Sequence, residues 1–105
     1  MDAANLLDLL KRMVETDSRL PVEERLARLM ADEVRTLGLE PVWQEIAPGR
    51  PNVWAMAKLG PKPGLVTLTG HLDTVLVAEG WNTDPFQPTE RGGKLYGLEI
   101  GRAHV

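Results

Sequence analysis

The chain has 105 residues, of which 43% are hydrophobic and 26% charged, a composition that suits one globular domain and a length too short for two. Twelve Lys and Arg against fifteen Asp and Glu give a net charge of −3 without a block of one sign, which argues against nucleic-acid binding or a polybasic membrane patch. Cysteine is absent, which excludes disulfides, thiolate metal ligands and a Cys nucleophile. Any metal must therefore be held by His, Asp or Glu.

The sequence also argues against membrane insertion and secretion. No apolar run approaches the ~18 residues of a membrane span. Residues 1–5 lack the basic segment that begins a signal peptide. We therefore expect a cytoplasmic domain with neither a nucleic acid nor a membrane as partner.

The first third of the chain has the apolar spacing of two helices. Apolar residues recur at three- and four-residue steps from Leu6 to Val14, with charged residues between them. A second stripe from Leu26 to Leu37 predicts another helix, with Pro21 in its first turn, where a missing N–H costs nothing. Gly38 directly follows this stripe, and we expect it to adopt the left-handed conformation that ends many helices.

After Gly38 the apolar period changes to two, which is typical of strands. Residues 39–46 and 52–59 flank a Pro/Gly turn at 47–51 and predict an antiparallel hairpin. The β-branched run at 65–69 predicts a further strand, of the kind found in a sheet covered on both faces. From Gly70 onward the residues are typical of a long loop, a feature that often marks a functional surface.

Residues 70–75, Gly-His-Leu-Asp-Thr-Val, are the main candidate for chemistry. At period two, His71 and Asp73 project to the same side. A neutral imidazole can ligate Zn²⁺ through one nitrogen while a carboxylate accepts a hydrogen bond from the other, which fixes the ring. A catalytic zinc needs about three protein ligands, so this pair alone leaves open an ordinary solvated or structural pair.

Three motifs in this order resemble the dizinc amidohydrolases and exopeptidases, the family that includes acetylornithine deacetylase, succinyl-diaminopimelate desuccinylase, aminoacylase and carboxypeptidase G. They are the run from Leu65 to Val75, then Trp81-x-x-Asp84-Pro85-Phe86, then Gly93-Lys94-Leu95-Tyr96-Gly97. The resemblance covers the chain from about Leu6 to Gly97. It implies an α/β fold in which residues 1–97 form two helices, a hairpin and the start of a mixed sheet, as part of a zinc-exopeptidase-like catalytic domain.

The resemblance also implies a chemistry. His71 is the expected ligand to one of two zincs, with Co²⁺ as an alternative metal, and Asp73 is the expected catalytic residue that orients His71 and tunes its basicity. In such enzymes a glutamate acts as general base on a metal-bound water that attacks an amide carbonyl. Substrates are N-acyl amino acids or small peptides, and the parent enzyme is expected to be a homodimer. Deacetylase, desuccinylase and carboxypeptidase activities all stay open.

The sequence departs from the family pattern after Gly97. In the family an Arg-Gly and then the bridging Asp ligand follow, whereas residues 98–105 here are Leu-Glu-Ile-Gly-Arg-Ala-His-Val. Only one of the expected metal ligands is present, so we expect a truncated and inactive fragment of the hydrolase. Without the later strands of the sheet, Val66 and Leu68 should leave apolar surface exposed.

Two other hypotheses stay open from the sequence. One is a small non-enzymatic α/β binding module that uses Trp81, Phe86 and Tyr96 as a recognition loop. A packed loop anchor is the ordinary interpretation of the first two aromatic residues. The other hypothesis is a self-contained mononuclear metal site formed by His71, Asp73 and His104.

The tail yields a prediction about the gene. Residues 100–105 can be encoded by ATC GGA AGA GCA CAC GTC, which matches the start of a widely used sequencing adapter, so we expect residues 98–105 to be a non-native, adapter-encoded tail. Reading the nucleotide sequence tests this, because any other codons for these six residues would remove the hypothesis. In the uninterrupted gene, an Arg-Gly-x-x-Asp segment should follow Gly97.

Overall fold

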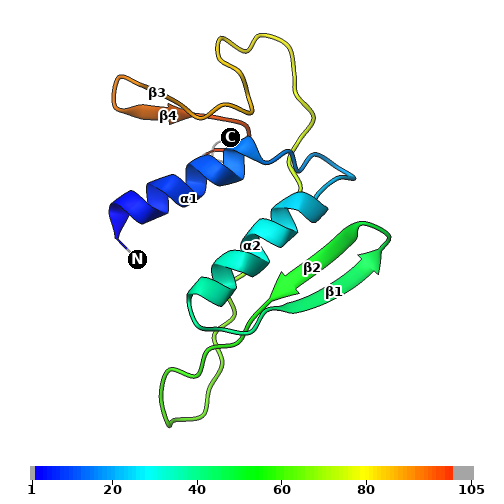
Figure 1. The fold of residues 1–105 in the computed structure, drawn as a ribbon, viewed down its shortest axis with the longest axis vertical. Coiled ribbons are helices and arrows are strands. Elements are labelled where there is room, and N and C mark those ends of the chain that lie inside the picture. Colours follow the sequence, from blue (N-terminus) through cyan, green and yellow to red (C-terminus); the bar gives the residue numbers. More distant parts are fainter. Residues whose placement is uncertain (1, 101–105) are drawn as a thin grey trace.

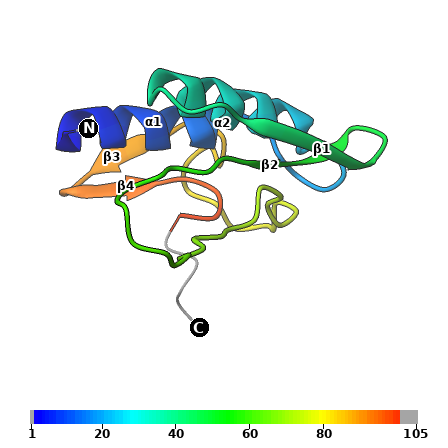
Figure 2. The same cartoon turned by 90° about the horizontal axis from the view of Figure 1, so that it is seen from below.

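The computed structural model describes residues 2–100, which form two helices and two hairpins (Figure 1). The elements in chain order are α1 (Ala3–Glu15), α2 (Glu24–Thr36), β1 (Val42–Ala47), β2 (Arg50–Trp54), β3 (Thr89–Arg91) and β4 (Lys94–Tyr96). Both helices lie on one side of the molecule, and the chain between residues 60 and 80 crosses the opposite side (Figure 2). This confirms the predicted α/β class. Instead of the start of a mixed sheet, the described residues form two separate antiparallel pairs.

The two helices form where the apolar spacing predicts them. The carboxylate of Asp2 accepts a hydrogen bond from the N–H of Asn5 at 2.8 Å and caps α1. Arg12 of α1 reaches Glu33 of α2 at 2.7 Å, an ion pair that raises the pKa of Arg12 and links the helices. Neither described helix is long and apolar enough to cross a bilayer.

The predicted end of α2 is confirmed, whereas its predicted start is wrong. Gly38 has a φ of +79°, and its N–H bonds to the carbonyl of Arg35 while the N–H of Leu39 bonds to that of Val34, the pattern of a Schellman motif. Pro21 lies before the helix, in a turn closed by a hydrogen bond from the N–H of Val22 to the carbonyl of Arg19. That turn occupies the residues assigned to the first helical turn.

The predicted hairpin is confirmed, with a shorter turn than expected. β1 and β2 pair antiparallel with Gln44 opposite Asn52, and Arg50 and Pro51 belong to β2 rather than to the turn. The guanidinium of Arg28 lies 5.4 Å from the centre of the Trp43 ring, which places one face of the hairpin against α2.

The predicted strand at residues 65–69 is wrong, since the chain there has no regular structure. A strand is stabilised by hydrogen bonds to a neighbouring strand, and no described segment pairs with this one. The predicted exposure is confirmed: Leu65, Val66 and Leu68 are 77%, 86% and 92% exposed.

The hairpin of β3 and β4 was not predicted from the sequence. Gly92 and Gly93 connect its strands with φ values of +60° and +75°, as a type I′ turn requires. The long loop that begins at Gly70 therefore ends before β3, at Pro88.

The residues that follow β4 pack against the two helices and complete a small apolar core. Its buried apolar side chains are Val14, Leu26, Ala27, Ala31 and Leu98. A Cβ added to Gly97 would lie 2.7 and 2.9 Å from the two methyl carbons of Val14, so only glycine fits there without a shift. The N–H of Leu98 bonds to the carbonyl of Pro85 at 2.9 Å. His104, with the rest of residues 101–105 of the predicted tail, lies outside the described residues.

The link between the helices is held by an ion pair between two residues that flank Ser18. The carboxylate of Asp17 accepts hydrogen bonds from the Nε and Nη2 of Arg19 at 3.0 and 2.7 Å, and from the Arg19 main-chain N–H at 3.1 Å. We call this arrangement the Asp17–Arg19 clamp. The hydrogen bonds from Arg19 hold the pKa of the Asp17 carboxyl below its ordinary value.

Replacing Gly97 by Ala should destabilise the helical core. The added methyl group overlaps Val14, and overpacking of this kind costs about 1–3 kcal/mol. Loss of helix in urea, followed by far-UV circular dichroism, should shift to lower urea for Gly97→Ala. Gly60→Ala is the matched control, because nothing lies within 4 Å of a Cβ there. Equal curves for the two variants would contradict the close approach.

The Asp17–Arg19 clamp should make the fold sensitive to acid. Because the folded-state pKa of Asp17 is depressed, its stabilisation is present above the unfolded value of about 3.9 and is lost as pH falls through the folded value. Asp17→Asn should therefore lower the urea midpoint at neutral pH, and the difference from the wild-type chain should vanish in strong acid. Asp32→Asn, at an exposed ion pair, is the control. Parallel pH curves for Asp17→Asn and the wild-type chain would refute this assignment.

Candidate functional site

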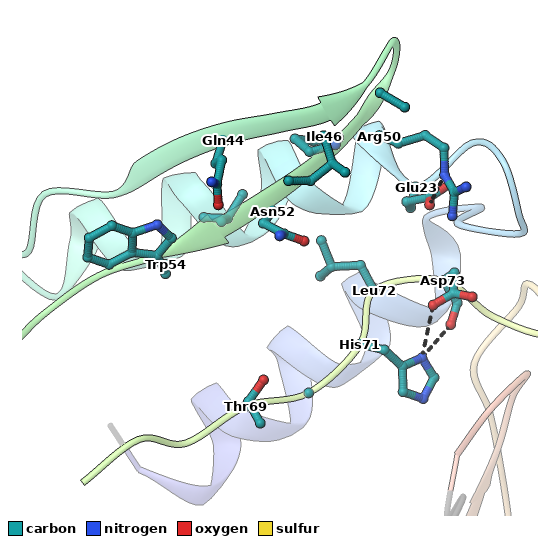
Figure 3. A pocket seen from close by; sticks show the side chains of 14 residues that line it. Glu23, Gln44, Ile46, Arg50, Asn52, Trp54, Thr69, His71, Leu72 and Asp73 are labelled. Carbon is teal, nitrogen blue, oxygen red and sulfur yellow. Dashed lines mark hydrogen bonds and ion pairs between the residues drawn. The ribbon is translucent and has the colours of Figure 1, made fainter. Parts of the chain in front are cut away.

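His71 and Asp73 lie on the irregular segment that crosses the molecule opposite the helices. Their side chains point toward each other on one side of the segment, while Leu72 points to the other side, toward the hairpin (Figure 3). The two residues predicted from period two to share one side therefore do so, although the segment is not a strand. Both remain accessible, with side chains 39% and 45% exposed.

The ring of His71 is held mainly by the main chain of Asp73. Nδ1 of His71 lies 2.7 Å from the Asp73 carbonyl oxygen and 3.3 Å from the carboxylate oxygen Oδ1. A carbonyl can only accept a hydrogen bond, so Nδ1 carries a proton, and in the neutral ring the lone pair is then on Nε2. This is the tautomer in which Nε2 can act as a metal ligand. The sequence predicted the carboxylate as partner, but the shorter contact is to the carbonyl.

The described residues around His71 do not form a complete metal centre. Nε2 of His71 lies 3.9 Å from the Oε1 of Glu99, whose other oxygen accepts the N–H of Val75 at 3.2 Å. Glu99 lies within residues 98–105, which the sequence predicts to be a non-native tail. Within residues 2–100, no three His, Cys, Asp or Glu side chains gather closely enough to hold a metal ion. The accessible Nε2 of His71 therefore has no closed coordination sphere around it among the described residues.

A cavity of about 650 Å³ separates this segment from one face of the hairpin. Gln44 and Asn52, opposite each other on β1 and β2, lie on its wall with Ile46 and Trp54 (Figure 3). This face is opposite the one that packs on α2, because side chains alternate along a strand. The hairpin therefore lines the cavity with both polar amide groups and apolar side chains, and the segment that carries His71 forms the facing wall.

A buried carboxylate at the end of this cavity was missed in the sequence. Oε1 of Glu23 accepts a hydrogen bond from the Nε of Arg50 at 2.7 Å, 27 residues away, and the Glu23 side chain is 8% exposed. Its other oxygen, Oε2, is buried without a hydrogen-bond partner among the described residues. The ion pair fastens the start of β2 to the start of α2. The sequence carried no signal for it, because the partner, Arg50, lies far along the chain at the start of β2.

Ser18 and Arg19 are the second set that sequence analysis missed. The N–H of Thr74 donates to the carbonyl of Ser18 at 3.1 Å, and Arg19 and Thr74 form an isolated parallel β-bridge. Ser18 is almost fully buried. This bridge attaches the segment that carries His71 to the link between the helices.

The aromatic residues of the predicted recognition loop do not form one surface. Trp81 and Tyr96 line a shared hollow of about 310 Å³, which Phe86 does not line. The Phe86 ring instead lies under the guanidinium of Arg19, 4.8 Å from its centre. Phe86 thus acts as the packed loop anchor that the sequence suggested.

Curated proteins similar to this chain include acetylornithine deacetylases and a succinyl-diaminopimelate desuccinylase. The chain is 43% identical over 76 residues to acetylornithine deacetylase of Proteus mirabilis (strain HI4320), a match that covers 71% of the chain and 20% of the relative. It is 33% identical over 106 residues to acetylornithine deacetylase of Vibrio atlanticus (strain LGP32), covering 93% and 28%. It is 35% identical over 95 residues to succinyl-diaminopimelate desuccinylase of Bordetella avium (strain 197N), covering 88% and 24%.

The matches extend over most of the chain but over only 20% to 28% of the length of these relatives. No protein-family model and no solved structure matches the chain. The relatives agree with the family suggested by the motifs around His71, Trp81 and Tyr96. The chain belongs to the family of acetylornithine deacetylase and succinyl-diaminopimelate desuccinylase.

Proposed function

We propose that this chain forms one part of a zinc-dependent hydrolase that cleaves the amide bond of N-acyl amino acids or small peptides. The observation that carries the proposal is the similarity to deacetylases and a desuccinylase over as much as 93% of the chain. Both names describe removal of an acyl group from an amino acid nitrogen. The products of such a reaction are a free carboxylate and an amine.

His71 is the residue that we propose as a metal ligand. Its Nδ1–H is held by the Asp73 carbonyl at 2.7 Å, so the lone pair of Nε2 is available to a metal. A zinc ion bound there would polarise the amide carbonyl and lower the pKa of a bound water. We propose that Asp73 orients His71 through both its carbonyl and its carboxylate, which makes it a positioning residue.

The same geometry supports the proposal that the chain alone is inactive. A catalytic zinc site needs about three protein ligands, and residues 2–100 contribute one imidazole without two further ligands gathered near it. The remaining ligands and the general base would come from the part of the family's sequence that this chain does not match. We retain the proposal that residues 1–97 supply this part of the catalytic domain and that residues 98–105 supply none of it.

A chimaeric enzyme tests the function. Residues 6–97 would replace the aligned segment of acetylornithine deacetylase of Vibrio atlanticus, and hydrolysis of acetylornithine would be measured. We expect activity that is lost on chelation and restored by Zn²⁺ or Co²⁺. In the same chimaera, His71→Ala should lower kcat/KM by about 1000-fold, which corresponds to about 4 kcal/mol, and Asp73→Ala by about 10- to 100-fold.

Arg35→Ala is the matched control, because within residues 2–100 this exposed side chain pairs with Asp32 on α2, away from the segment that carries His71. It should leave kcat/KM within about twofold of the parent chimaera. A folded chimaera that is active and keeps its activity after His71→Ala would overturn the assignment of His71. A folded chimaera that is inactive with every metal would overturn the proposed activity.

A further inference from the structure

The segment that carries His71 has few attachments to the rest of the protein. Within the described residues, the N–H of Thr74 donates to the carbonyl of Ser18, its one hydrogen bond to main chain elsewhere, and the N–H of Val75 donates to the carboxylate of Glu99 at 3.2 Å. The hydroxyls of Ser18 and Thr74 add no hydrogen bond at this bridge, because both are buried without a partner among residues 2–100. Of these two attachments, the bond at Thr74 directly follows Asp73, and its place depends on where the Ser18 carbonyl is held.

The Asp17–Arg19 clamp holds that carbonyl. Three hydrogen bonds from Arg19 to the Asp17 carboxylate, one of them from the main chain, fix the backbone on both sides of Ser18. A fork of this kind uses the planar geometry of guanidinium, which Lys cannot reproduce. Because the Ser18 carbonyl lies between the two clamped residues, its direction is set by the clamp.

Arg19 also contacts the loop that precedes β3. Its guanidinium lies 4.8 Å from the centre of the Phe86 ring, and the N–H of Phe86 donates to the carboxylate of Asp84 at 2.9 Å. One side chain therefore contacts the loop before β3 and, through Asp17, orders the backbone that binds Thr74. In the sequence, the link at residues 17–19 comes before the segment that carries His71, and the loop at residues 84–86 comes after it.

We propose that Arg19 is a positioning residue for His71. By fixing the Ser18 carbonyl, it anchors Thr74 and so keeps residues 71–73 in the turn where the Nδ1–H of His71 donates to the Asp73 carbonyl. The consequence is a ring whose Nε2 lone pair has a fixed direction. The link to catalysis rests on the proposed function of His71 as a metal ligand, whereas the positioning effect itself does not need a metal.

The test uses the 105-residue chain without metal and two readouts. Long-range ¹H–¹⁵N spectra of the histidine-labelled chain report which ring nitrogen of His71 carries the proton, with His71→Gln used to assign the signals. Amide hydrogen exchange reports the protection of the Thr74 N–H. The variants are Arg19→Met, Arg19→Lys and Asp17→Asn, with Arg35→Met as the matched control at the exposed pair with Asp32.

In the wild-type chain we expect the Nδ1–H form of His71 to dominate and the Thr74 N–H to be protected. Arg19→Met should lower that protection about tenfold or more and remove the preference for Nδ1–H. Arg19→Lys should restore part of both effects, because it keeps the charge and the contact with Phe86 but loses the fork. Arg35→Met should change neither readout.

The proposal is overturned if Arg19→Met keeps the wild-type tautomer and Thr74 protection while its far-UV circular dichroism is unchanged. If Arg19→Met does not fold, Arg19→Lys and Asp17→Asn carry the test, and wild-type values in both would overturn it. Neither readout requires a metal, so the result is separate from that of the chimaera. A shifted tautomer with an inactive chimaera would refute the hydrolase and leave the positioning role in place.

Discussion

The apolar core between the two helices is small, and the arrangement of the rest of the chain follows from that limit. Buried apolar side chains come from α1, α2 and Leu98 only, within residues 2–100. Burial of apolar surface is the dominant favourable term in folding, so this core can hold the helices and the structure next to them. It does not extend to Val66 and Leu68, which stay in solvent. Polar contacts therefore hold the segment that carries His71.

Local features of the fold could be predicted from the sequence, and features that depend on partners could not. The spacing of apolar residues located both helices, and Gly38 located the end of α2, because these depend on residues within a few positions. The strand expected at 65–69 did not form, since a strand needs a neighbour and β-branched residues alone do not supply one. The hairpin around Gly92 and Gly93 was predictable from its turn, but its strands are too short to show a clear alternation.

The candidate site follows the same division. The spacing of His71 and Asp73 correctly placed them on one side of the chain. That the Asp73 carbonyl makes the shorter contact depends on the backbone conformation, which residue types do not specify. Arg19 and Glu23 were missed because their roles come from contacts with Phe86 and Arg50, far away in sequence. Contacts between residues so far apart leave no recognisable motif in the sequence.

The hydrogen bond between Thr74 and Ser18 makes the local stability of the segment that carries His71 separate from that of the helices. Because the segment is outside the core and its hydrogen bonds to other parts of the chain are few, it can detach while α2 and its hairpin stay folded, as a local opening. A ligand that engages His71 only in the attached state draws the population toward that state, in proportion to its concentration over its dissociation constant. Ligand occupancy and local order are therefore linked at this site, and each increases with the other.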